Sequence, residues 1–253
     1  KVRAAVMARP AGQRQVLVFT HGFNTRFDEA VFRFAQIVED TGFQGVPILF
    51  SWPSRGSATE YGYDRDSAIY SRDQLEVLLT GLGNESSIGS VDIFAHSMGN
   101  WLTLETLRQA SIANNKRATS KIRRVVLAAP DVDMDVFRTQ ITRMGDLSSR
   151  FVLYASSDDN ALRLSRFLFG GMNRAGENTD LAEFKRLGIE AHDLSGVPGG
   201  FGKNHGKAFN DAETVRSIGG VLAERGPEAR PGNVISDGVE ALGRLTRKLT
   251  PGQ

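Results

Sequence analysis

The chain has 253 residues, of which 40% are hydrophobic, so it is long enough to bury one substantial core as a single domain. Its 31 Lys and Arg nearly balance its 29 Asp and Glu, which gives a net charge of +2. The basic residues are scattered along the chain, which argues against nucleic acid as the main partner. The absence of cysteine excludes disulfides, thiolate nucleophiles and cysteine-based metal sites.

No stretch approaches the roughly 20 apolar residues of a membrane span, so no stable membrane insertion is expected. The N-terminus also lacks a charged segment followed by an apolar one, the pattern of a signal peptide. The chain begins at Lys1 rather than Met. The compartment therefore stays open between the cytoplasm and, if a leader was removed before Lys1, the periplasm or the exterior.

Short apolar runs rich in β-branched residues alternate with helix-length amphipathic stretches. The runs are QVLVFTHG (15–22), VPILFSWP (46–53), VDIFAHS (91–97), RRVVLAAPD (123–131) and RFVLYASSDD (150–159). The expected helices cover 27–40, 64–82, 98–114 and 133–145. Continuous apolar runs suit parallel strands covered on both faces, and the alternation predicts a mostly parallel, doubly wound sheet flanked by helices.

The first expected helix, 27–40, has Val31, Phe34, Ala35 and Val38 at helical spacing, which predicts its buried face.

The C-terminal third of the chain carries weaker signals. A helix around DLAEFKRL precedes a weak strand, GIEAHDLSG (188–196). A glycine-rich loop (196–209) and a helix (210–225) follow. We therefore predict one α/β domain over 1–225, and a linker with a short helix or tail over 226–253.

Ser97 lies where a predicted strand meets a predicted helix, inside the pattern Ala-x-Ser-x-Gly. In hydrolases with a Gly-x-Ser-x-Gly turn the serine adopts a strained backbone conformation, and the residues two before and two after it must be small. Ala95 and Gly99 meet that requirement. We interpret Ser97 as a nucleophile.

A serine nucleophile needs a base, and the chain has four histidines. His21 precedes a glycine after the first strand, which suits an oxyanion loop. His96 is adjacent to the serine and its side chain is expected to point elsewhere, as a bystander. His192 lies within a predicted strand. His205 follows every other candidate, and the chain order Ser, acid, His favours it as the base.

The triad acid is expected at the carboxyl end of a strand between Ser97 and His205. Two clusters compete, PDVDMD with Asp131, Asp133 and Asp135, and SSDDNAL with Asp158 and Asp159. Asp159 heads an Asp-x-x-Leu turn whose leucine is expected to face the core. We favour Asp159, with Asp158 next and Asp131 third.

The HGFN stretch, 21–24, lies between the first strand and a helix, where backbone N–H groups can point at a developing oxyanion. We assign Phe23 and Met98 as the two donors, with Asn24 as the alternative. No set of His, Asp and Glu has metal-site spacing, so neither a metal nor another cofactor is expected.

These motifs together resemble the α/β-hydrolase superfamily, and within it a bacterial esterase- or lipase-like family of uncharacterised domain. HGFN, FSWPS and AHSMG in this order and spacing carry the resemblance, which covers most of residues 15–170. It implies the α/β-hydrolase fold, hydrolysis of carboxylic esters, and a Ser97, Asp159 and His205 triad. Ala95 in place of glycine is a departure that some lipase-like members share.

The expected activity is therefore that of a serine hydrolase, a carboxylesterase or lipase, acting on a small-molecule ester through an acyl-enzyme. Only about 20 residues separate the apolar run 123–131 from the next run, 150–159, so no large lid domain is expected between them. The insertion 163–187, with RFLFGGM, either lines an acyl pocket or packs on the sheet. An open site predicts short to medium acyl chains.

Two alternatives to an esterase remain open. An amidase, thioesterase or transacylase uses the same triad, and a non-catalytic binding protein on this fold would use none.

Overall fold

The computed structural model describes residues 1–168, 173–197 and 205–223. Its centre is a six-stranded sheet in the order β2-β1-β3-β4-β5-β6, in which all neighbouring strands are parallel. The strands are β1 (Gln15–Thr20), β2 (Val46–Phe50), β3 (Ser90–His96), β4 (Ile122–Ala128), β5 (Phe151–Ala155) and β6 (Glu190–Asp193). This is the parallel sheet that the alternation of strands and helices predicts.

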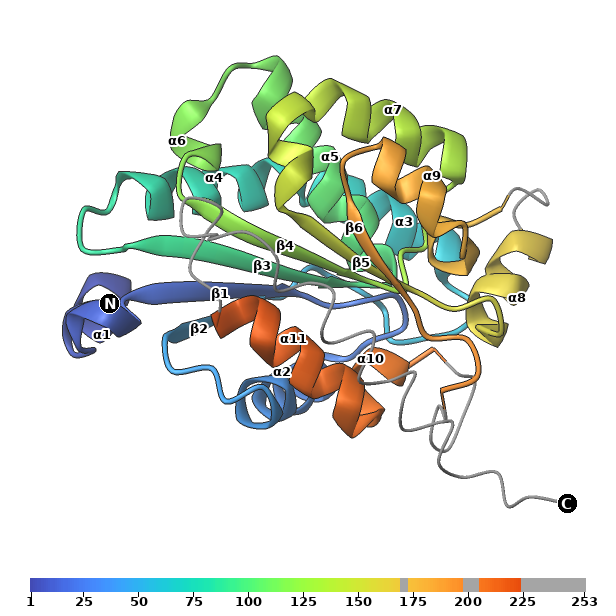
Figure 1. Ribbon diagram of the computed structural model, residues 1–253, viewed down its shortest axis with the longest axis horizontal. Helices are drawn as coiled ribbons and strands as arrows, with labels where there is room; N and C mark the ends of the chain where they lie inside the picture. Colours follow the sequence, from blue (N-terminus) through green and yellow to red (C-terminus); the bar gives the residue numbers. More distant parts are fainter. Residues whose placement is uncertain (169–172, 198–204, 224–253) are drawn as a thin grey trace, which may run out of the picture. The chain divides into compact units, whose positions relative to one another are not determined.

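Helices cover both faces of the sheet (Figure 1). One face carries α2 (Phe27–Asp40), α10 (Lys207–Asn210) and α11 (Ala212–Ala223). The other carries α3 (Tyr61–Tyr70), α4 (Arg72–Asn84), α5 (Met98–Ile112), α6 (Lys116–Thr119), α7 (Met134–Met144) and α9 (Leu181–Arg186). The short α1 (Val2–Met7) precedes β1, and α8 (Asn160–Leu168) follows β5.

The strand order reverses between β1 and β3, and this position decides where a site can form. The chain passes from β1 to the edge strand β2 and then crosses to β3 on the other side of β1. In such sheets the loops after the two strands diverge and leave a crevice at their carboxyl ends. The loop after β1 and the turn after β3, which carry HGFN and Ser97, therefore lie next to each other.

Central strands are fully buried, whereas the edges are not. β4 and β5 are buried at every residue, while β2 and β6 at the two edges are mostly half-buried or exposed. The expectation that VPILFSWP is covered on both faces was therefore wrong, because an edge strand has a neighbour on one side only.

The buried face of α2 differs from the predicted one. Ala30, Phe34 and Ile37 are buried, whereas Val31 and Ala35 are exposed. Phe34 stacks on Phe19 of β1 with ring centroids 5.2 Å apart. Both sets have helical spacing, so the aromatic contact with the sheet, which the helix sequence does not contain, fixes the rotation of the helix.

The predicted helix over 64–82 is two helices, α3 and α4, that meet at Ser71. Hydrogen bonds of helical type continue through this residue, from Ser71 N–H to Ser67 O and from Leu75 N–H to Ser71 O. Between β4 and β5 the chain forms α7 and a 3-10 helix, Gly145–Arg150, and no lid domain. No helix among the described residues is long and apolar enough to cross a membrane. The predicted tail, 226–253, lies outside the described residues.

Candidate active site

Ser97 occupies a strained turn between β3 and α5. Its φ of 52° and ψ of −123° lie in a region that non-glycine residues rarely adopt. The turn is held by Asn100, whose Nδ2 donates to the carbonyls of Ser97 and Ala128 at 3.0 and 2.9 Å. The strain therefore persists because neighbouring hydrogen bonds fix the backbone on both sides of the serine.

Two glycines let the surrounding backbone approach this turn. A Cβ on Gly99 would lie 2.5 Å from the carbonyl oxygens of Thr20 and His21, and one on Gly22 would lie 2.9 Å from Ser97 Cβ. Neither distance is tolerated by real side chains. The loop after β1 therefore contacts the serine directly because both positions lack a side chain.

Asp159 and His205 are brought together across the end of the sheet. Asp159 Oδ2 lies 2.7 Å from His205 Nδ1, and the Asp159 side chain is 1% exposed. Its other oxygen, Oδ1, accepts from the backbone N–H groups of Ala161 and Leu162 at 3.0 and 3.1 Å. Because the carboxylate accepts, Nδ1 carries the imidazole proton and Nε2 is left as the acceptor. Leu162 is buried, as the Asp-x-x-Leu turn predicts.

Asp158, the alternative acid, has a different partner. It accepts a hydrogen bond from Lys207 Nζ at 2.5 Å and another from Ser156 Oγ. Burial alone would raise the pKa of Asp158, but the hydrogen bonds and charge of these partners lower it overall. Asp131 contacts Tyr61, Ser165 and Arg174 rather than a histidine. Of the three predicted acids, Asp159 is the one that contacts His205.

Ser97 and His205 border one cavity of 240 Å³. No direct hydrogen bond joins Ser97 to His205 among the described residues. In free enzymes the contact between nucleophile and base is commonly long, and it shortens when substrate is bound. The walls include Phe23, Tyr61 and Leu164, and the Phe23 and Tyr61 rings meet edge to face with centroids 5.1 Å apart. Asp131 and Ser165 also line it.

A polar cluster forms one wall of this cavity. Tyr61 Oη donates to Asp131 Oδ2 at 2.8 Å, and Ser165 Oγ donates to Asp131 Oδ1 at 2.8 Å. Arg174 Nε lies 3.3 Å from the same Oδ1. Burial and the Asp131 charge raise the pKa of Tyr61, so its hydroxyl stays protonated and keeps donating.

The loop after β1 offers one free backbone donor next to the serine. Asn24 N–H donates to Asp64 Oδ2 at 3.1 Å, so it is not available to an oxyanion. Within the described part of the chain, no acceptor contacts the backbone N–H of Phe23 or of Met98. Of the predicted donors, Phe23 and Met98 thus keep an N–H without an acceptor among the described residues, whereas the alternative, Asn24, does not.

Asp64 is a buried carboxylate that sequence reasoning missed. It is 0% exposed and accepts from three groups, the Asn24 N–H, the Ser54 hydroxyl at 2.6 Å and the Arg55 N–H at 2.8 Å. It thereby joins the HGFN loop to the loop after β2. The stretch GYDRDSA indicates only a helix start, so no local signal identified this role.

His21 supports the same loop from below. Its ring stacks on Trp52 with centroids 4.9 Å apart, and Trp52 Nε1 donates to the His21 carbonyl at 2.9 Å. Its Nδ1 lies 2.9 Å from the Gly22 carbonyl, and burial lowers the pKa of His21. His21 therefore lies within the loop after β1 and contacts Trp52 and Gly22.

His96 is not the bystander that the sequence suggested. Its Nε2 lies 3.1 Å from the His205 carbonyl oxygen, and the two rings have centroids 4.8 Å apart. Burial, and then the charges of His205, Arg33 and His21, lower the pKa of His96 well below its usual range. The neutral ring donates from Nε2 to that carbonyl and so holds the segment that carries His205. His192 lies elsewhere, stacked on Tyr154 at the β6 edge with centroids 4.8 Å apart.

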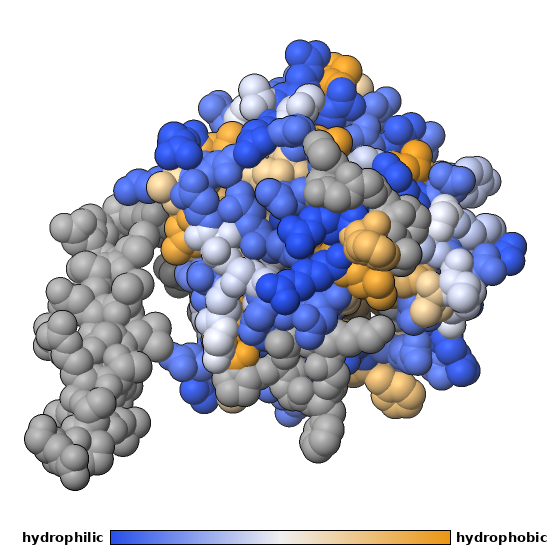
Figure 2. Space-filling model, turned by 90° about the vertical axis from the view of Figure 1, so that its right-hand side faces the viewer, coloured by the Kyte–Doolittle hydropathy of each residue, from blue (hydrophilic) through white to orange (hydrophobic). Residues whose placement is uncertain are grey.

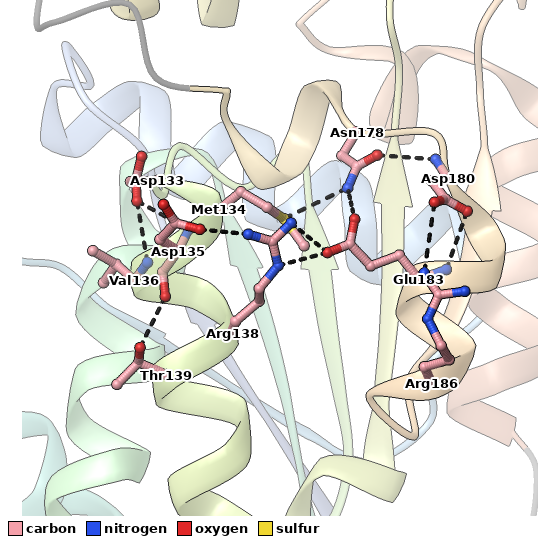
Figure 3. Close-up of polar contacts among 10 residues, drawn as sticks. All are labelled: Asp133, Met134, Asp135, Val136, Arg138, Thr139, Asn178, Asp180, Glu183 and Arg186. Carbon is pink, nitrogen blue, oxygen red and sulfur yellow. Dashed lines mark hydrogen bonds and ion pairs between the residues drawn. The ribbon is translucent and has the colours of Figure 1, made fainter.

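A larger cavity of 630 Å³ lies apart from the triad, between α7, α8 and α9. Arg138 of α7 ion-pairs with Asp135 on its own helix and donates from Nε to Glu183 of α9 at 2.6 Å, while Asn178 Nδ2 donates to Glu183 at 2.8 Å (Figure 3). The Arg138 guanidinium thus pairs with two carboxylates and joins α7 to α9. Among the described residues no group of three or more His, Asp or Glu could hold a metal ion.

Comparisons with known proteins show the family and support the fold. The model of the family "Alpha/beta hydrolase of unknown function (DUF900)" matches residues 3–225. A hydrolase from Thermoplasma acidophilum described as CIB-like has 14% identity, coverage of 83% of this chain and 87% of its own, and a TM-score of 0.52. SOBER1 from Arabidopsis thaliana has 10% identity, coverage of 82% and 97%, and a TM-score of 0.50. At these identities the two structures support the fold alone.

An uncharacterised protein from Nostoc sp. strain PCC 7120, alr1448, is 24% identical to this chain over 38% of the chain and 32% of the relative. The chain thus matches about a third of that relative's length. The family match, by contrast, spans nearly the whole predicted domain. The chain therefore belongs to the family of alpha/beta hydrolases of unknown function, DUF900.

Proposed function

We propose that this protein is a serine hydrolase that cleaves carboxylic esters through an acyl-enzyme. The observation that carries the proposal is the buried Asp159 to His205 hydrogen bond of 2.7 Å beside a cavity that the strained Ser97 also borders. An oriented imidazole next to a serine at a strand-to-helix turn is the arrangement that activates a hydroxyl for acyl transfer.

In the proposed reaction, His205 Nε2 takes the proton of Ser97 Oγ as that oxygen attacks the ester carbonyl carbon. The Phe23 and Met98 N–H groups hold the oxyanion, and Asp159 stabilises the imidazolium. The C–O bond to the alcohol then breaks, and His205 returns its proton to the leaving alkoxide. Water repeats the sequence on the acyl-enzyme and releases the acid.

The acyl part is proposed to be short or medium in length. The cavity at Ser97 has a volume of 240 Å³, and one of its walls is the polar cluster of Tyr61, Asp131 and Ser165. Each methylene transferred from water to an apolar site gains about 0.8 kcal/mol, but only the part of an alkyl chain that fits within this volume can contribute that gain. Long alkyl chains therefore gain little from this cavity.

The test compares the wild type with Ser97→Ala on p-nitrophenyl acetate, butyrate, octanoate and palmitate. We expect the variant to lose at least about a thousandfold in kcat, and the wild type to prefer the shorter esters. Ser51→Ala is a matched control, because Ser51 is exposed and lies near the same loop. Unchanged turnover by Ser97→Ala would overturn the proposal, and fastest cleavage of the palmitate would overturn the chain-length part alone.

A further inference from the structure

A second cavity of 350 Å³ lies beside the one at Ser97 and is bordered by α2, the HGFN loop and α10. The two cavities share Asn24, His96 and His205, but Ser97 borders only the first. Both are lined by residues that follow β1 and β3 at the carboxyl ends of the strands, and Figure 2 shows this side of the molecule, where apolar and strongly hydrophilic residues lie side by side. His205 therefore borders both cavities.

Arg33 of α2 gives the second cavity its positive charge. Among the described residues the half-buried guanidinium reaches only neutral oxygens, Gln36 Oε1 at 3.3 Å and Asn210 Oδ1 at 3.4 Å, and it lies 5.1 Å over the Phe209 ring. No carboxylate of the described residues lies within ion-pair distance of it. A partly buried cation without a counter-ion is costly, and an arginine fork suits a bidentate anion.

Glu29 also borders this cavity, one turn before Arg33. It is exposed, and its Oε2 accepts the Arg26 N–H at 2.8 Å at the start of α2. It therefore serves the helix start and does not neutralise Arg33.

A chain of ring contacts leads from Arg33 to the catalytic histidine. The Phe209 ring under the guanidinium meets the His96 ring at a centroid distance of 4.6 Å, and the His96 ring lies 4.8 Å from that of His205. The Arg33 charge contributes to the lowered pKa of His96. The rings of Phe209 and His96 thus separate the cation from the ring of His205.

The chemistry of ester cleavage assigns an occupant to each cavity. The alcohol oxygen must lie at His205 to receive its proton, so the rest of the alcohol extends into a cavity that His205 borders. The acyl carbon must lie at Ser97, and the cavity that Ser97 borders takes the acyl part. The second cavity is left for the alcohol.

We propose that the preferred substrates are esters whose alcohol part carries an anionic group, a carboxylate, sulfonate or phosphate, which pairs with Arg33. This inference rests on the ester hydrolysis proposed above. The covalent steps are unchanged, since Arg33 binds the alcohol part and takes no part in proton transfer.

The experiment compares kcat/KM for two acetates, 4-acetoxybenzenesulfonate, which is anionic, and 4-nitrophenyl acetate, which is neutral. The readout is their ratio in each variant divided by the ratio in the wild type, which cancels the intrinsic reactivity of the leaving groups. We expect Arg33→Gln to lower the ratio about tenfold, an effect of one ion pair, and Arg33→Lys to lower it less. Arg143→Gln, which removes the same charge from the exposed face of α7, should leave the ratio unchanged.

An unchanged ratio in Arg33→Gln would overturn the inference. A third ester, 4-nitrophenyl hemisuccinate, carries its charge on the acyl part. A loss of kcat/KM in Arg33→Gln that is confined to this ester would also overturn the inference. Ser97→Ala separates this failure from that of the proposed function. If Ser97→Ala abolishes cleavage of both acetates, the proposed serine hydrolase activity holds, and the Arg33 variants test the alcohol preference alone. If Ser97→Ala still cleaves them, the proposed function itself is wrong.

Discussion

Asp64 is the residue that joins the loops on either side of the candidate oxyanion site. Its carboxylate accepts from Asn24 of one loop and from Ser54 and Arg55 of the other, and it does not border the cavity at Ser97. We regard it as a positioning residue that sets the direction of the Phe23 N–H. The sequence could not predict this, because the acceptor and its donors are up to 40 residues apart.

We expect Asp64→Asn to lower kcat by about tenfold with little change in KM, because an oxyanion donor acts mainly in the transition state. The amide also loses at least one buried hydrogen bond to a charged group, which is worth about 1.5–3 kcal/mol. Steady-state kinetics and urea unfolding measure the two effects separately.

Asp66→Asn, two positions along α3 at an exposed site, is the matched control and should change neither quantity. A rise in KM at constant kcat in Asp64→Asn would contradict a role in directing the oxyanion donor.

Asp158 and Asp159 are adjacent carboxylates with separate partners, Lys207 and His205. We expect Asp159→Asn to lower kcat by about 10⁴-fold, because the amide stabilises the wrong tautomer of the histidine. Asp158→Asn should cost less than about tenfold, since it weakens a tether and leaves the histidine bond intact. Comparable losses in the two variants, measured on one ester, would contradict the assignment of Asp159.

At the scale of elements, a buried lysine fastens the segment that carries His205 to the end of β5. Lys207, which is 2% exposed, donates to Ser156 Oγ at 3.0 Å, Asp158 Oδ1 at 2.5 Å and the Leu194 carbonyl at 2.9 Å. In sequence this lysine belongs to a glycine-rich loop, and nothing nearby indicates that it is buried. It follows the candidate base by two residues, and the structure adds that it is buried and hydrogen-bonded there.

We expect Lys207→Met to lower the free energy of unfolding by about 3 kcal/mol, because removing one partner leaves buried acceptors without a donor. It should also lower kcat, since His205 loses its support. Denaturant unfolding and ester kinetics measure both.

Lys185→Met on the exposed side of α9 is the control. If Lys207→Met were as stable and as active as this control, the tether would have no role.

The elements also show which local signals suffice. The helix predicted over 27–40 begins and ends at those residues, because its apolar spacing and its acidic first turn both indicate a helix there. The rotation of that helix could not be predicted, because Phe34 contacts Phe19 of a different element. In the same way, small residues around Ser97 predicted a tight turn, but the approach of Gly22 to the serine depends on two loops about 75 residues apart.

At the scale of the whole molecule, the sheet order brings the site together. Ser97 follows β3, Asp159 follows β5 and the HGFN loop follows β1, so their positions depend on parallel strands that end at one edge. The alternation of strands and helices predicts this edge from sequence. The supporting contacts of Asp64, His96 and Lys207 are not predictable, since each joins segments far apart along the chain.

Two histidines, the buried His21 and the half-buried His96, make the folded state sensitive to acid. The pKa values of His21 and His96 are lowered, chiefly by burial, so the unfolded chain binds more protons than the folded one as the pH falls through about 6.5. Stability is therefore fully present above that pH and declines below it, by up to about 1.4 kcal/mol per pH unit for each histidine.

Urea unfolding at pH 7.5 and pH 5.5 measures this decline, and His96→Gln should make it shallower because it removes one of the two groups. A free energy of unfolding that stays constant or rises toward pH 5.5 would contradict the burial of these two rings as neutral groups.

The central claim is that Ser97 is a nucleophile activated by His205. The most direct measurement is labelling with a fluorophosphonate, followed by peptide mass spectrometry of the adduct. The account predicts one phosphonylated site per chain, on the peptide that contains Ser97, with labelling abolished in Ser97→Ala and slowed at least about a hundredfold in His205→Ala. Labelling that is absent in the wild type, or that persists in Ser97→Ala at the same rate, would contradict it.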